Sequence, residues 1–282
     1  MSIATKEYDW DPEVYQKNLS FVPKLASRIM QWLDADKDDA ILDLGCGDGV
    51  LDVDLGQIVS QGNGRLVGVD SSQPMIEAAK KAVAAASSPA VSERCTFEVM
   101  DATTLVDRPD LQKGEFTKVF SSSAMHWIMG PSDRREVFLQ GVKAALKPGG
   151  TFVFEMGGSG NVSEMRAAML AAVSRRVGGL DKIVEPWFFP DEAWMKTMLE
   201  DKIGGFKIEK SEMEWRATWA DQGGCDGWVR LVGAQLFDLV SEEEREECIK
   251  EAVGVTEVVC RMPDGKFAFN YVRLRVVARR LY

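Results

Sequence analysis

Residues 41–49, ILDLGCGDG, contain the pattern that decides the fold: an apolar run that ends in a glycine-rich turn. The run over 41–46 is typical of a strand buried on both faces, and residues 50–60 after the turn are predicted to be helical. Glycine allows a tight turn and lets the backbone approach a ligand closely. The stretch therefore predicts a strand–loop–helix unit with a ligand at Gly45, Gly47 and Gly49.

A carboxylate follows at the end of the next predicted strand. Residues 65–70, RLVGVD, form this strand, and Asp70 stands 21 residues beyond Gly49. An acidic group at that place can accept hydrogen bonds from both hydroxyls of a ribose. Together with the glycine turn, Asp70 indicates a cofactor that contains adenosine.

Two such cofactors compete, and the spacing favours S-adenosylmethionine over a dinucleotide. The dinucleotide fingerprint GxGxxG would place its third glycine where Val50 stands. Asp43, just before the turn, would repel a pyrophosphate but suits the ammonium of a methionine moiety. The strand over 95–100 ends at Asp101-Ala102, where a carboxylate can accept from an adenine amino group and the next N–H can donate to the ring.

Strand-like and helix-like segments alternate through the first half of the chain, which predicts a parallel, doubly wound α/β sheet. Ser72 is a plausible N-cap, and Ser241 with Glu244 matches a capping box. The predicted strands are 41–46, 65–70, 95–100, 116–124, 151–156, 206–215 and 267–281. The predicted helices are 50–60, 73–86, 133–147, 161–178, 191–204, 226–239 and 241–253.

Composition and charge narrow the function classes. The 282 residues carry a formal charge of −10, which disfavours a nucleic-acid or anionic membrane partner. No apolar run is long enough to cross a bilayer, and no apolar signal core is seen, so we expect a cytoplasmic protein. Five cysteines without CxxC spacing and a single histidine predict neither a disulfide framework nor a metal site. The sequence does not indicate an oligomeric state.

Five segments resemble, in order, the motifs of class I S-adenosylmethionine-dependent methyltransferases: ILDLGCGDG, VGVDSSQPMIEAA, FEVMDATTL, FTKVFSSSAMHWI and LKPGGTFVFEM. Residues 10–15, 124–127, 226–229 and 277–281 are similar to trans-aconitate methyltransferases. The resemblance implies seven strands in the order 3-2-1-4-5-7-6, with the last strand antiparallel. We expect a small helical cap over 158–204 and 221–262. The predicted organisation is a site-closing helical segment (1–40), a cofactor-binding Rossmann-like core (41–157), and cap helices with the last two strands (158–282).

The resemblance also implies which residues hold the cofactor. The three glycines would lie against its methionine part, Asp70 at the ribose, and residues 121–123 beneath the sulfonium. Trp10 and Tyr15 would lie on an N-terminal segment that closes over the site. The expected cofactor residues are Asp43, Gly45, Gly47, Gly49, Asp70, Ser71, Met75, Asp101, Ala102 and Ser121.

Candidates for the substrate site are aromatic and basic. Five of the eight tryptophans fall in the second half and suggest an aromatic pocket, although such residues also pack cores. Arg166, Arg216 and Arg230 could clamp an anion, or could simply be solvated. The expected substrate-binding residues are Trp10, Tyr15, Trp127, Trp187, Trp228 and Arg230.

The predicted activity is methyl transfer to an oxygen of a small molecule, a carboxylate or a phenol or enol. A carboxylate needs no base at neutral pH, whereas a phenol, alcohol or protonated amine must first lose a proton. His126 is the candidate base, or else a pocket-wall residue, since the resembling family often has glutamine there. Two alternatives stay open: N-methylation of a small amine, and a cofactor-binding protein without methyl transfer.

Overall fold

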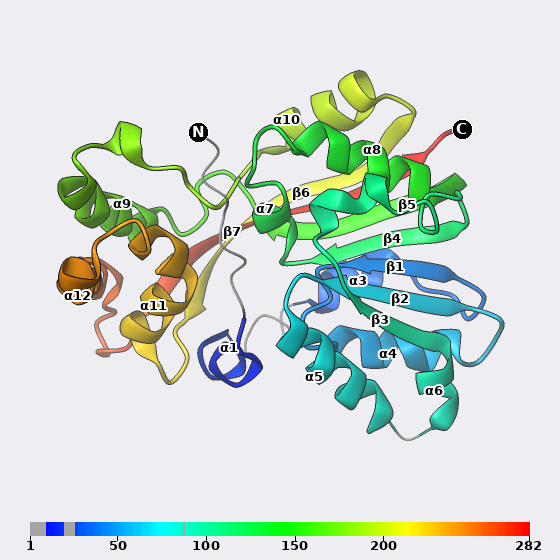
Figure 1. The fold of residues 1–282 in the computed structure, drawn as a ribbon, viewed down its shortest axis with the longest axis horizontal. Helices are drawn as coiled ribbons and strands as arrows, with labels where there is room; N and C mark the ends of the chain where they lie inside the picture. Colours follow the sequence, from blue (N-terminus) through cyan, green and yellow to red (C-terminus); the bar gives the residue numbers. More distant parts are fainter. Residues whose placement is uncertain (1–9, 20–25, 87) are drawn as a thin grey trace.

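The computed structural model describes residues 10–19, 26–86 and 88–282, and it contains a seven-stranded sheet (Figure 1). The strand order β3-β2-β1-β4-β5-β7-β6 confirms the predicted topology. The strands are β1 (Ala40–Leu44), β2 (Arg65–Asp70), β3 (Cys95–Val99), β4 (Phe116–Ser122), β5 (Leu146–Gly157), β6 (Phe206–Trp219) and β7 (Ala268–Arg280).

The first five strands are parallel, and β7 is antiparallel to both β5 and β6. Ile41, Leu42 and Leu44 of β1 are fully buried, as expected for a central strand covered on both faces. β5 begins earlier than the sequence indicated, because Leu146 pairs with Phe116. Residues 146–150, which precede the predicted strand over 151–156, therefore belong to β5.

Helices cover both faces of the sheet, as Figure 1 shows. One face is packed by α3 (Ser27–Leu33), α4 (Val50–Val59), α5 (Gln73–Ala84) and α6 (Pro89–Arg94). The other is packed by η1 (Ala102–Asp107), α8 (Arg135–Ala145), α10 (Glu192–Lys196) and η3 (Thr197–Ile203). Ser72 caps α5 as predicted, with its hydroxyl accepting from the N–H of Met75 at 3.4 Å. The sequence did not predict α6.

A separate helical cap lies beyond the carboxyl ends of the parallel strands. It consists of α9 (Ser163–Val177), η2 (Leu180–Lys182), α11 (Gly224–Phe237) and α12 (Glu242–Cys260), with its own apolar core. Two predictions were wrong here. Residues 192–203 belong to the sheet layer, because Met195 and Leu199 are buried against it. Ser241 is the N-cap of α12, but its side chain makes no capping hydrogen bond.

The hairpin of β6 and β7 connects the sheet to the cap. β7 pairs with β5 from Arg273 to Arg279, whereas its pairing with β6 continues to Ala268. The first residues of β7 and the last residues of β6 therefore project past the sheet toward α11 (Figure 1). Arg273 lies where the hairpin leaves the sheet. No helix of the described ranges is both long and apolar enough to cross a bilayer.

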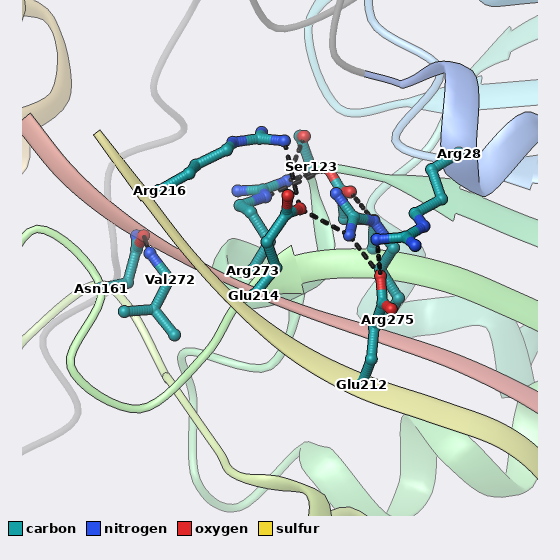
Figure 2. Close-up of polar contacts among 10 residues, drawn as sticks. Arg28, Ser123, Asn161, Glu212, Glu214, Arg216, Val272, Arg273 and Arg275 are labelled. Carbon is teal, nitrogen blue, oxygen red and sulfur yellow. Dashed lines mark hydrogen bonds and ion pairs between the residues drawn. The ribbon is translucent and has the colours of Figure 1, made fainter. Parts of the chain in front are cut away.

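A buried ion-pair network holds this junction together (Figure 2). Glu155 of β5 accepts hydrogen bonds from Arg273 Nε at 3.0 Å and Nη2 at 2.9 Å, and its other oxygen accepts from Arg275 Nε. Arg275 also contacts Glu212 at 2.6 Å and Glu214 at 2.7 Å, both on β6. Glu155 is 2% exposed, so removal of its charge would leave two arginines buried without their shared partner.

We predict that Glu155→Ala lowers the free energy of unfolding by about 3–5 kcal/mol, because an unpaired buried charge is costly. Glu209→Ala is the control: it breaks an exposed pair between Glu209 of β6 and Arg279 of β7 and should cost no more than about 1 kcal/mol. Urea unfolding of the two variants measures both values. Equal losses in the two variants would show that the network does not stabilise the junction.

Candidate active site

A cavity opens at the carboxyl ends of β1, β2 and β4, between the sheet and the cap, where ligands of open α/β sheets bind. Elements from the whole chain contribute to it: the segment before α1 (Pro12–Leu19) and α1 itself, the glycine turn, α7 (Met125–Ile128), the cap and β7. The predicted site residues that line it are Trp10, Tyr15, Gly45, Gly47, Asp70, Met75, His126, Trp127, Trp187 and Trp228.

The glycine turn is held against Asp70 by hydrogen bonds. Asp70 accepts from the N–H of Gly47 at 3.0 Å and from the N–H of Ser72 at 2.9 Å. Burial raises the pKa of Asp70, whereas these two hydrogen bonds act in the opposite direction. Gly45 has a φ of +78°, and a Cβ there would lie 2.2 Å from that of Ala124. No other residue fits this position without moving α7.

These residues fit an adenosine-containing cofactor. Gly47 has a φ of +58° and lines the cavity, and a Cβ built on it would meet open space. The backbone is thus bare toward the cavity, next to the carboxylate of Asp70. Asp70 would accept from the ribose hydroxyls, Gly45 and Gly47 would lie along the methionine part, and Met75 would lie near the adenine.

Six of the expected cofactor residues do not line the cavity: Asp43, Gly49, Ser71, Asp101, Ala102 and Ser121. The Asp101 carboxylate caps η1 by accepting from Thr103 N–H at 2.8 Å, and Ser121 donates to the carbonyl of Leu44 at 2.6 Å. Asp43 is buried beside Asp52. Burial and the neighbouring carboxyl raise the pKa of Asp43 well above its usual range.

His126 lies on α7, which follows β4, and is half-buried in the cavity wall. Its Nδ1 accepts a hydrogen bond from the N–H of Gly157 at 3.4 Å, which assigns the ring proton to Nε2. Burial, with a smaller contribution from the positive charge of Arg273, lowers the pKa of His126 from 6.5 to about 3. The imidazole is therefore neutral at physiological pH and can donate through Nε2.

Aromatic rings form most of the remaining wall. Trp127 packs edge to face against Trp10 at 5.3 Å and against Trp187 at 5.6 Å between ring centroids. Trp187 in turn stacks on Phe189 at 6.2 Å. Trp10 comes from the N-terminal segment, so this chain of rings joins that segment to the cap across the cavity.

The arginine in the cavity wall is Arg273, which the sequence analysis did not single out. Arg230 instead binds Asp226 and Glu246 on the surface of the cap, and Arg166 binds Glu185. Arg216 is half-buried near Glu214 but does not line the cavity. The signal for Arg273 lay in YVRLRVV over 271–277, where two charges interrupt an otherwise apolar strand.

Comparison with known proteins assigns the family. The methyltransferase domain family matches residues 41–150. An uncharacterized methyltransferase of Schizosaccharomyces pombe is 34% identical to this chain over 276 residues. The match covers 96% of this chain and 98% of the yeast protein. The chain belongs to the class I S-adenosylmethionine-dependent methyltransferases.

A more weakly matching methyltransferase and a solved structure are also similar to this chain. A trans-aconitate 2-methyltransferase of Azoarcus sp. is 24% identical, covering 96% of this chain and 99% of its own. The crystal structure of geranyl diphosphate C-methyltransferase from Streptomyces coelicolor, in complex with Mg²⁺, geranyl diphosphate and S-adenosylhomocysteine, shares the fold with a TM-score of 0.51. It is 16% identical, covering 92% of this methyltransferase and 79% of that chain.

We predict that Asp70→Ala weakens S-adenosylmethionine binding by about 1–3 kcal/mol, because the ribose hydroxyls lose a charged acceptor. Asp101→Ala removes a carboxylate outside the cavity lining and should change affinity much less. Calorimetric titration of the wild type and both variants gives the comparison. The assignment of Asp70 fails if Asp101→Ala is the more damaging change.

Proposed function

We propose that this methyltransferase transfers the methyl group to a carboxylate oxygen of a small molecule. The observation that carries the proposal is the pair of groups in the cavity wall: a neutral, half-buried imidazole at His126 and a guanidinium at Arg273. Both can bind an oxygen anion, and neither is suited to remove a proton. The enclosed aromatic wall favours a small molecule over a protein or nucleic acid.

A carboxylate is already ionised at neutral pH, so binding and alignment are the enzyme's main tasks. Arg273 would hold one carboxylate oxygen, and the Nε2–H of His126 can donate to the same group. S-Adenosylmethionine, when bound, supplies a methyl carbon attached to a positively charged sulfur. A carboxylate oxygen forms the new O–CH₃ bond, and the electron pair of the broken S–CH₃ bond remains on sulfur. No proton is transferred.

The phenol and amine alternatives fit these groups less well. A phenol loses its proton near pH 10, far above the pKa of about 3 at His126, so the imidazole would be a weak base for it. An amine is a cation at neutral pH before it reacts, and Arg273 would repel it. The wall of the cavity therefore supports an acid over either alternative.

The N-terminal segment is proposed to close the cavity and exclude water. The carbonyl of Trp10 accepts from the Ser72 hydroxyl at 3.2 Å, and Gln16 Nε2 donates to Asp48 at 2.9 Å. Both partners belong to the cofactor side of the site. The proposed closing role is confined to residues from Trp10 to α1, because α3 packs on the sheet face with Ile29 and Leu33 buried.

We predict that His126→Gln retains turnover within about tenfold, because an amide can replace one hydrogen-bond donor worth about 1 kcal/mol. The pH–rate profile of the wild type should be flat from about pH 6 to 8, because a pKa lowered to about 3 keeps the imidazole neutral throughout. Steady-state rates on the best acid acceptor test both points. A limb near pH 6.5 in the wild type that disappears in His126→Gln would instead establish a histidine base.

We predict that Trp10→Ala lowers kcat/KM by roughly 10- to 100-fold, because an open site misaligns the reactants. The free energy of unfolding should change by no more than about 1–2 kcal/mol. Trp219→Ala is the control, since Trp219 is 51% exposed on β6 and lies outside the cavity lining. The closing role is refuted if the two variants retain the same kcat/KM.

A further inference from the structure

We infer that the acceptor is a monocarboxylic acid with an apolar, flat body, and that the cavity discriminates against acids with a second carboxylate. The inference rests on the proposed carboxylate methylation and adds the class of acid. The charges in the cavity wall, the hydrogen bonds of Arg273 and the side chains around the remaining space all favour such an acid.

The cavity wall offers one permanent positive charge. Among the lining residues that the structure describes, Arg273 is the sole arginine or lysine, and His126 is neutral. Two carboxylates, Asp48 and Asp70, stand on the cofactor side of the same cavity. A second carboxylate on the substrate would have to give up its water without gaining a cation, and the two aspartates would repel it.

Arg273 itself can accommodate one further anion oxygen. Its Nε and Nη2 donate to Glu155 at 3.0 and 2.9 Å, and Nη2 also donates to the hydroxyl of Ser123 at 2.5 Å. Nη1 makes no hydrogen bond to any part of the chain that the structure describes. The guanidinium is thus fixed at one edge and free at the other, which suits a single carboxylate oxygen.

Arg273 has only a shared carboxylate in the network behind it. The less exposed members of this network are the guanidinium groups of residues 216, 273 and 275 and the carboxylates of residues 155, 212 and 214, and the exposed Arg28 pairs with Glu212 at its edge (Figure 2). Arg273 shares its one carboxylate with Arg275, which has two more. Of the four, Arg273 is the group that lines the cavity.

Apolar and aromatic side chains form a large part of the cavity wall beside Arg273, together with the polar side chains of Ser123, Asn161 and Tyr271. Val162, Val232 and Trp228 line the cavity together with the stacked pair Trp187 and Phe189. The indole N–H of Trp228 donates a hydrogen bond to the hydroxyl of Tyr271 at 2.7 Å, so it already has a partner. Such a wall stabilises a bound planar hydrocarbon body. It offers few polar partners to a molecule with several carboxylates.

The test uses acids matched in body and different in charge. Labelled methyl transfer is measured with trans-cinnamic acid, with its 4-carboxy derivative, with trans-aconitate, and with a phenol and an amine of similar size. We expect kcat/KM for cinnamic acid to exceed that for each polyacid by about 100-fold, because an unpaired desolvated carboxylate is costly. Calorimetry with the enzyme saturated with S-adenosylhomocysteine measures the affinity for each acid as well.

Variants then test Arg273 as the cause of the preference. Arg273→Met should raise KM for cinnamic acid by about 100-fold with a smaller effect on kcat, whereas Arg279→Met, in an exposed pair on the same strand, should leave both unchanged. If Arg273→Met does not fold, the double variant Arg273→Met/Glu155→Gln removes both buried charges and should show the same rise. S-Adenosylmethionine affinity reports whether each variant keeps an intact cofactor site.

The outcomes separate this inference from the proposed function. Methylation or binding of a polyacid as good as that of cinnamic acid, or an unchanged KM in the folded Arg273 variants, overturns the monoacid inference and leaves carboxylate methylation standing. Methylation of the phenol or the amine and of none of the acids overturns the proposed function itself. If no monoacid binds to the saturated enzyme, the inference is also overturned.

Discussion

The shared carboxylate of Glu155 is the interaction on which the arrangement of this enzyme depends. Glu155 lies on β5 opposite Arg275 of the neighbouring strand β7, close to the point where the hairpin of β6 and β7 extends beyond β5 toward the cap. By binding Arg273 and Arg275 at once, it fixes the hairpin and therefore the distance of the cap from the cofactor turn. The same ion pair that stabilises the junction also delivers a guanidinium to the cavity.

Arg273 and His126 are two polar groups beside the aromatic wall, and the place where the hairpin puts Arg273 affects the charge of His126. Arg273 is close enough to His126 to help lower the imidazole pKa, which burial lowers most. A cation and a neutral hydrogen-bond donor together make a site for an anion that is already formed. Methyl transfer to such an anion needs alignment and exclusion of water more than acid–base catalysis. The site therefore has the groups that the proposed chemistry uses.

Local patterns in the sequence were sufficient to predict the sheet, and four of the ten expected cofactor residues, Gly45, Gly47, Asp70 and Met75, line one cavity. The turn around Gly47 and the carboxylate of Asp70 belong to one strand–loop–helix unit and its neighbour, so their spacing determines their geometry. The substrate side of the cavity was harder to predict, because it is formed by segments that are far apart in the chain. The sequence suggested Arg230 and not Arg273, but the fold places Asp226 and Glu246 around Arg230. Only the pairing of β7 with β5 shows which charged residue of the strand reaches Glu155.

The most direct test of carboxylate methylation is the chemical stability of the product. The enzyme is incubated with S-adenosylmethionine labelled in its methyl group and with an accepted substrate, and the isolated product is treated with mild alkali. A methyl ester hydrolyses under these conditions, so we expect the label to be released as volatile methanol. Label that stays on the product through the same treatment would indicate a methyl ether or an N-methyl group and would contradict methylation of a carboxylate.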